Sequence, residues 1–167
     1  MRTVTACAPS KTFNLAGLIG AYHVVADADL RERLEKEAGS THYNDVNVLS
    51  YHALLGAYSD GGAEWVDELC SVIRDNVSFA CDFIENRFEG VGLMRPQGTY
   101  MIYLDLKGYL ASSGKTCEEV LRAGWDAGVA WQDGRPFLCP DSIRMNLALP
   151  KALVREAFSR LEKYVFR

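Results

Sequence analysis

A long pattern of apolar residues with helical spacing, in the middle of the chain, limits its possible folds more than any other feature. Apolar residues recur at spacings of three and four from Trp65 to Phe88, which predicts an amphipathic helix of about six turns. Such a helix must bury one face against a sheet or another helix. The apolar period then changes to two, which is typical of β-strands. Strand-forming runs follow at residues 100–106, 128–132 and 142–148, and we expect them to pair in one sheet.

Further helical patterns complete a small α+β domain over residues 40–167. One helix is predicted at 44–58, a second at 118–127 between the first two strands, and an amphipathic helix at 152–166 closes the chain. Helices and strands in this order, with short connections late in the chain, are typical of α+β architecture.

The N-terminal part, residues 1–39, has a different pattern of short elements. Residues 3–7 are β-prone, and residues 18–26 form a second, mostly apolar run, so each predicts a strand. Leucines four residues apart then predict a solvated helix at 30–36, which we expect Gly39 to end.

Composition narrows the class of partner and of site. With 18 basic and 22 acidic side chains the net charge is -4, so no basic surface is expected for nucleic acid or an anionic membrane. The five cysteines have neither CxxC spacing nor a nearby histidine cluster, so no metal site is predicted. They are typical of reduced thiols in a cytoplasmic protein. No apolar run reaches the length of a membrane span, and we expect a small-molecule partner.

Lys11 is the first candidate for chemistry. It follows a predicted strand, between Ser10 and Thr12 and just after Pro9, where a side chain can be held in a cleft at the strand end. Partly shielded among hydroxyls and the ring of Phe13, such a lysine could supply the neutral amine that a Schiff base requires. A lysine near a terminus is otherwise usually exposed to solvent, and the residues alone leave both interpretations open.

Arg144 is the second candidate. It lies in the middle of the strand-forming run at 142–148, where a guanidinium is costly unless its N–H donors meet a carboxylate or a phosphate. The alternative is an arginine on an edge strand that faces water. Spacing alone favours this simpler role.

Four segments share an order and a spacing with one known family. They resemble the class I/II aminotransferases and, in particular, the MalY/PatB subgroup of cystathionine β-lyases, and together they extend over almost the whole chain. The segments are Ala8–Leu18 around Lys11, Gly62–Leu69 together with Asn76, Pro96–Tyr100 followed by Leu104–Asp105, and Arg144–Pro150.

The resemblance implies the fold type I of pyridoxal-phosphate-dependent transferases, which is α/β overall. Residues 40–167 would be the C-terminal small domain, and residues 1–39 would be a remnant of the large cofactor-binding domain. More than half of the usual enzyme would then be absent, including the phosphate loop and the aspartate that pairs with the cofactor ring. Strands within residues 1–26 would lack their neighbours, so we expect uncovered apolar side chains there and self-association into a homodimer or a larger assembly.

The resemblance also implies roles for individual residues. Lys11 would bond covalently to pyridoxal 5′-phosphate and later act as general base at the substrate α-carbon. Ser10 would be the nearest hydroxyl for a cofactor contact, because Ala8 stands where many relatives have serine. Arg144 would bind the α-carboxylate of an amino-acid substrate through a two-pronged salt bridge.

Several functions fit this resemblance. The subgroup's activity predicts α,β-elimination of cystathionine or related cysteine-type amino acids to pyruvate, ammonia and a thiol. An aminotransferase would instead return the proton to the cofactor, and nothing in the sequence separates these outcomes. A catalytically inert piece, structural or partner-binding, that needs a separate N-terminal half is a further hypothesis. The simplest alternative is an unrelated α+β domain with a chance lysine motif.

Overall fold

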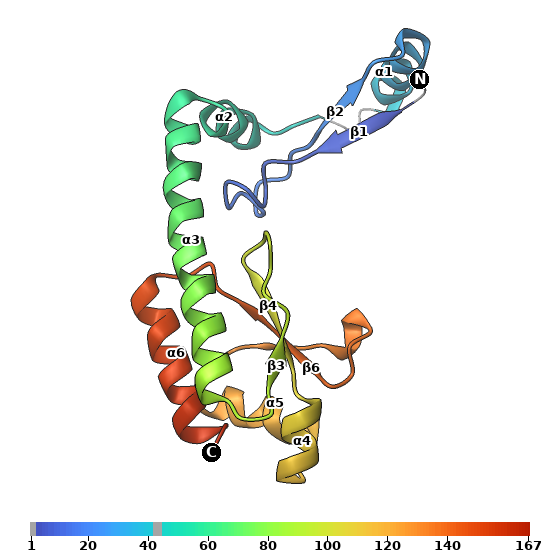
Figure 1. Cartoon of the computed structure of the whole chain (residues 1–167). Coiled ribbons are helices and arrows are strands. Elements are labelled where there is room, and N and C mark those ends of the chain that lie inside the picture. Colours follow the sequence, from blue (N-terminus) through green and yellow to red (C-terminus); the bar gives the residue numbers. More distant parts are fainter. Residues whose placement is uncertain (1–2, 42–44) are drawn as a thin grey trace. The chain divides into compact units, whose positions relative to one another are not determined.

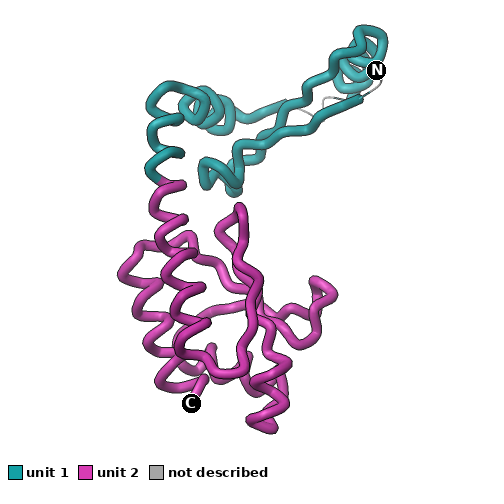
Figure 2. The backbone as a smooth tube through the Cα atoms, viewed as in Figure 1, with its two compact units in different colours: residues 1–68 teal, residues 69–167 magenta. Residues whose placement is uncertain are grey.

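The chain divides into two compact units, residues 1–68 and 69–167, in a computed structural model that describes residues 3–41 and 45–167 (Figures 1 and 2). The division falls inside a continuous helix, α3 (Asp60–Arg87). This helix confirms the one predicted from the apolar spacing between Trp65 and Phe88. The domain boundary expected between residues 39 and 40 stays a prediction.

The first unit contains a two-stranded antiparallel ribbon. β1 (Val4–Cys7) pairs with β2 (Tyr22–Val25) along its whole length. Both predicted strands are confirmed, the second in a shorter form. The two strands pair with each other, so one edge of each is satisfied within the chain. Val24 is still 57% exposed and Ile19 85% exposed, as expected for uncovered apolar side chains, whereas Val25 is buried.

The helix after this ribbon, α1 (Ala28–Thr41), begins at an aspartate cap. The Asp27 side chain accepts a hydrogen bond from the backbone N–H of Leu30 at 2.9 Å, which satisfies one of the free donors of the first turn. Gly39 lies inside α1, so the prediction that it ends the helix is wrong. A single glycine costs only about 1 kcal/mol relative to alanine within a helix, which the remaining turns can offset.

The next helix, α2 (Val48–Ala57), lies within the range predicted at 44–58. Asn47 caps it, because its side chain accepts a hydrogen bond from the backbone N–H of Ser50 at 2.9 Å. Residue 44, the predicted start, lies outside the described residues. The helix is therefore confirmed over its described length.

The second unit is built around a four-stranded antiparallel sheet in the order β3-β4-β6-β5. The expected pairing of three strands in one sheet is confirmed. The run expected at 128–132 contributes only a two-residue strand, displaced toward its end, and β3 is too short to produce a periodic pattern. The strands are β3 (Gly92–Leu93), β4 (Met101–Asp105), β5 (Gln132–Asp133) and β6 (Ser142–Asn146).

The second unit also contains helices, which are labelled in Figure 1. Those predicted at 118–127 and 152–166 are confirmed, while the short helix after β4 and a 3₁₀ turn were not predicted. Among the described residues, no helix combines the length and the apolar character needed to cross a membrane. The elements are α4 (Lys107–Ser113), α5 (Cys117–Asp126), the 3₁₀ turn η1 (Arg135–Phe137) and α6 (Lys151–Tyr164).

One face of the sheet forms the core of this unit. Leu104 of β4 lies opposite Ile143 of β6, and both are fully buried. Because side chains alternate between the two faces of a strand, Tyr103 and Arg144 lie on the other face. Helices α3, α5 and α6 pack against the buried face with side chains that include Ile84, Val120 and Phe158.

Candidate functional site

Lys11 lies on a tight turn that directly follows β1. The backbone N–H of Phe13 donates to the carbonyl of Pro9, and the N–H of Leu15 donates to that of Ser10, each at 2.9 Å. Pro9 is buried, Ser10 is half-buried and Lys11 is exposed. The turn is therefore fixed by its backbone while its lysine side chain faces solvent.

The partial shielding expected for Lys11 is absent from this structure, because the residue is exposed. Within the described part of the chain, neither the Lys11 amine nor the Ser10 hydroxyl has a hydrogen-bond or ion-pair partner. An amine without a carboxylate partner and a free hydroxyl beside it are both available to a ligand.

An aromatic cluster holds the lysine turn. The ring of Phe13, two residues after Lys11, contacts Tyr58 edge-on at 5.5 Å and stacks on Trp65 at 6.2 Å between ring centroids. The Tyr58 and Tyr22 hydroxyls are 3.2 Å apart, and this hydrogen bond is the main reason that the pKa of Tyr22 is raised to about 12. The turn is thus packed between β2, the end of α2 and the start of α3.

Arg144 lies at the centre of the second unit's sheet. It is directly opposite Tyr103 of β4 on one side and Gln132 of β5 on the other. The alternative of an arginine on an edge strand is therefore wrong, since β6 is an inner strand. Arg144 is half-buried, and its Cζ lies 4.5 Å from the ring centroid of Phe137.

The Arg144 guanidinium makes no ion pair with any carboxylate of residues 3–41 and 45–167. A half-buried charge of this kind gains from an anionic ligand with two oxygens, which matches the fork of its N–H donors. The sequence identified Arg144 correctly as a residue in mid-strand, but it gave no indication of the aromatic ring beside it.

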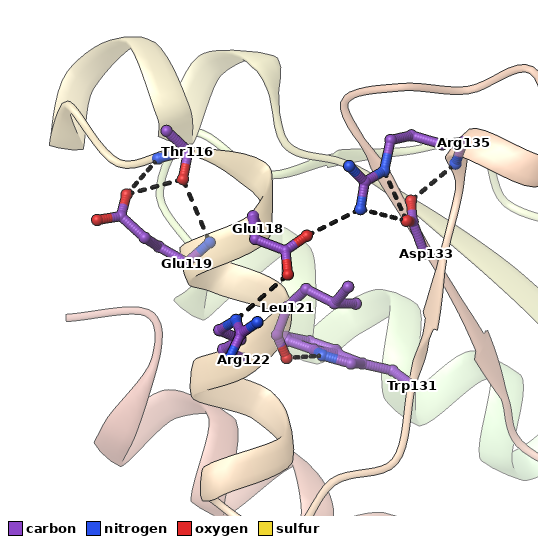
Figure 3. Close-up of polar contacts among 8 residues, drawn as sticks. All are labelled: Thr116, Glu118, Glu119, Leu121, Arg122, Trp131, Asp133 and Arg135. Carbon is purple, nitrogen blue, oxygen red and sulfur yellow. Dashed lines mark hydrogen bonds and ion pairs between the residues drawn. The ribbon is translucent and has the colours of Figure 1, made fainter.

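A network of ion pairs joins η1 to β5 and α5 (Figure 3). Arg135 of η1 donates from Nε to Asp133 at 2.6 Å and from Nη2 to Glu118 at 2.8 Å. The carboxylate of Asp133 also accepts the backbone N–H of Arg135 at 2.8 Å, and this hydrogen bond is the main cause of the lowered pKa of Asp133. The network fixes η1 to the start of α5.

Asn76 connects the long helix to the strand that carries Arg144. Its buried amide donates to the carbonyl of Leu147 at 3.0 Å and to that of Leu149 at 2.8 Å. Both carbonyls follow β6, so this one side chain joins two of the four motif segments. The sequence places Asn76 in a motif segment without a role, although a polar residue on the apolar face of an amphipathic helix is the signal that could identify it.

The candidate residues belong to different units. Lys11 and Ser10 lie in the first unit and Arg144 lies in the second, so each part of the candidate site is defined within its own unit. In the described ranges, no group of three or more His, Cys, Asp or Glu side chains could hold a metal ion.

Comparisons with a family model and with individual proteins agree on one family. The family model for aminotransferase class I and II matches residues 3–161. Cystathionine beta-lyase PatB of Bacillus subtilis (strain 168) is 33% identical over 122 residues, which are 73% of this chain and 31% of PatB. Protein MalY of Escherichia coli (strain K12) is 32% identical over 99 residues, or 59% of this chain and 25% of MalY.

Solved structures extend the match to the fold. Cystalysin of Treponema denticola, whose crystal structure contains a pyridoxal 5′-phosphate cofactor, superposes with a TM-score of 0.79 at 28% identity and covers 96% of this chain. This chain covers 40% of cystalysin, and it spans about a third of the length of PatB. The mixed helix and strand architecture and the family resemblance expected from the sequence are both confirmed. The chain belongs to the aminotransferase class I and II family.

Proposed function

We propose that this chain carries the cofactor-linked lysine and the carboxylate-binding arginine of a pyridoxal-phosphate-dependent C-S lyase acting on cystathionine or related amino acids. The observation that supports this most directly is a solvent-facing lysine amine on a rigid turn within the matched segment, with no partner among residues 3–41 and 45–167. The similarity to a cystathionine β-lyase favours elimination over transamination.

The residues of the lysine turn fit this cofactor. The Lys11 amine is exposed, so an aldehyde can reach it, and the half-buried Ser10 hydroxyl can donate a hydrogen bond to a phosphate oxygen. Ala8 offers no such hydroxyl. We assign Lys11 as the covalent attachment point and Ser10 as a phosphate contact.

Each residue then has a defined task in the reaction. When bound, the cofactor supplies an electron-accepting ring that stabilises negative charge at the substrate α-carbon. Once the substrate amine has taken its place on the cofactor, the freed Lys11 Nζ would take the α-proton as general base. Arg144 binds the α-carboxylate with two N–H donors and so fixes the orientation of the bonds around the α-carbon.

The proposal is tested by incubating the full chain with pyridoxal phosphate and L-cystathionine. Elimination consumes one water and releases a thiol, pyruvate and ammonia, so the expected result is thiol and pyruvate in equal amounts, lost in Arg144→Gln. Supplying 2-oxoglutarate tests the aminotransferase alternative, because transamination would form glutamate with the thioether intact. A chain that produces none of these products contradicts unaided catalysis.

The second candidate function is that of a structural or partner-binding chain that needs a separate N-terminal half. The chain spans 31% of the length of PatB, and the first unit exposes large apolar side chains on α2, with Val48 at 70% and Leu49 at 71%. An apolar patch of this kind marks an interaction surface. Co-expression with the N-terminal part of a relative, followed by a lyase assay, tests this function, and unchanged activity would count against it.

We expect the isolated chain to self-associate through its apolar surface. Light scattering should give the mass of a dimer or a larger assembly, and Leu49→Lys should lower that mass because a charge on the patch is costly to bury. His52→Lys, at another exposed position of α2, is the matched control and should change the mass less. A monomeric mass for the unchanged chain would contradict the expectation.

The cysteines support a reducing compartment such as the cytoplasm. All five are free thiols in the structure, and proteins of oxidising compartments commonly use cysteines in disulfides. We propose a cytoplasmic location on this basis, which a fluorescent fusion of the full chain would test.

A further inference from the structure

We propose that Phe137, and the ion pairs that anchor its turn, position the Arg144 guanidinium for a carboxylate. This inference rests on the proposed function, since it takes Arg144 as the residue that binds a substrate carboxylate. It adds a positioning residue and a supporting network that the sequence motifs do not identify.

The contact between Phe137 and Arg144 restricts the arginine side chain. The Cζ atom lies over the aromatic ring, 4.5 Å from its centroid, in the range of a cation–π interaction. Among the described residues the guanidinium has no hydrogen-bond or ion-pair partner, so its N–H donors stay free for a carboxylate. Phe137 thus restrains the group without using its hydrogen-bonding capacity.

Tyr103 supports the same ring. It lies directly opposite Arg144 in the β4–β6 ladder, and its own ring meets Phe137 edge-on at 6.3 Å and 82°. Edge-to-face packing is a favoured arrangement for two aromatic rings. Phe137 is therefore held between a neighbour on the sheet and the guanidinium, although it is 42% exposed.

The backbone of the turn is fixed close to the strand. The N–H of Gly134 donates to the carbonyl of Ser142, the first residue of β6, at 2.9 Å, and the N–H of Phe137 donates back to Gly134 at 2.9 Å. A side chain at position 134 would place its Cβ 2.4 Å from the Cys139 carbonyl oxygen. This close approach leaves little freedom for the turn to move relative to Arg144, which lies two residues after Ser142.

The ion pairs provide the second anchor (Figure 3). Arg135 joins Asp133 at the end of β5 to Glu118 in the first turn of α5. Helix α5 is itself fixed in the core through buried Val120. The turn is thus bonded to a helix and to a strand of the core. Phe137 contacts Arg144 from this fixed turn and so restricts the movement of the arginine.

Restricting an arginine before binding should increase affinity. A free arginine loses much rotamer entropy when it is immobilised, and a group that is already oriented loses less on binding. Removal of the Phe137 ring is expected to weaken carboxylate binding about fivefold, the scale of one exposed cation–π contact.

Nuclear magnetic resonance of the full chain tests this inference without requiring activity. The Nε–Hε resonance of Arg144 is assigned by its loss in Arg144→Lys. We expect Phe137→Leu to shift this resonance, through loss of the ring current, and to increase the mobility of the arginine side chain. Arg135→Gln, which leaves the aromatic ring in place, should increase the same mobility, whereas Phe137→Tyr should preserve it.

Leu138→Ala is the matched control, because Leu138 is 93% exposed beside Phe137 and should leave the Arg144 resonance unchanged. Titration with sodium acetate then measures carboxylate affinity in the unchanged chain and in Phe137→Leu. Equal Arg144 mobility in the unchanged chain and in Phe137→Leu overturns the positioning role. If acetate does not move the resonance of the unchanged chain, the carboxylate role of Arg144 fails, and the mobility comparison still decides the positioning role separately.

Discussion

Replacing Lys11 with alanine is expected to abolish the covalent adduct between this chain and pyridoxal phosphate. The amine of Lys11 is exposed and without a partner among the described residues, so it should react with the cofactor aldehyde as nucleophilic lysines do. Borohydride reduction followed by peptide mass spectrometry should locate the adduct on the segment that contains Lys11. The variant should lose essentially all of the signal at that segment.

The control for this experiment is Lys36→Ala. Lys36 is also exposed and lies on α1 of the same unit, so its removal should leave the adduct at Lys11 unchanged. An adduct distributed evenly over many lysines, with no preference for position 11, would show ordinary surface chemistry and would contradict the assignment. The family membership, which rests on the match over residues 3–161, would not be affected by that result.

Gly124→Ala is expected to destabilise the second unit by about 3 kcal/mol, combining overpacking with a disrupted hydrogen bond. A Cβ at this position would lie 2.1 Å from Cε2 of Trp131, whose buried ring packs directly on the α5 backbone. The ring would have to move. The indole N–H of Trp131 also donates to the Leu121 carbonyl at 2.9 Å (Figure 3), so the movement would endanger this bond as well.

Urea unfolding followed by circular dichroism gives the change in unfolding free energy. Gly39→Ala is the matched control, because Gly39 also lies within a helix but a Cβ there meets no atom within 4 Å. That variant should be neutral or slightly more stable, since alanine is the better helix former. Equal unfolding free energies for Gly124→Ala and the unchanged chain would mean that Trp131 can repack at no cost.

Most elements that could be predicted from the sequence have a periodic spacing of apolar residues. The helix from Trp65 to Phe88 and the strand runs at 100–106 and 142–148 each repeat an apolar spacing several times, and the structure contains all three. Shorter elements repeat nothing, so β3 and η1 left no pattern to detect. The prediction that Gly39 ends a helix is wrong for a related reason. The helix-breaking preference of one glycine is weak compared with the stability of the remaining turns.

The candidate site could be predicted from the sequence only as far as individual residues. The local surroundings of Lys11 and Arg144 mark them as candidates, and their roles come from the family resemblance and stay predictions. The contact of Phe137 with Arg144 depends on how the turn after β5 folds back on β6, and Asn76 acts on carbonyls that are distant in the sequence. Such relations arise from tertiary packing, and no local spacing encodes them.

The buried amide of Asn76 also has a consequence for the order of folding. It bonds to a carbonyl 71 residues farther along the chain, and contacts between distant residues form slowly because a long loop must close first. Helix α3 can form early from local bonds, but the side-chain N–H groups of Asn76 can reach their two carbonyl acceptors only after the segment that follows β6 has folded against the helix. We therefore expect the Arg144 strand to reach its final geometry among the last steps of folding, when the long helix docks against it.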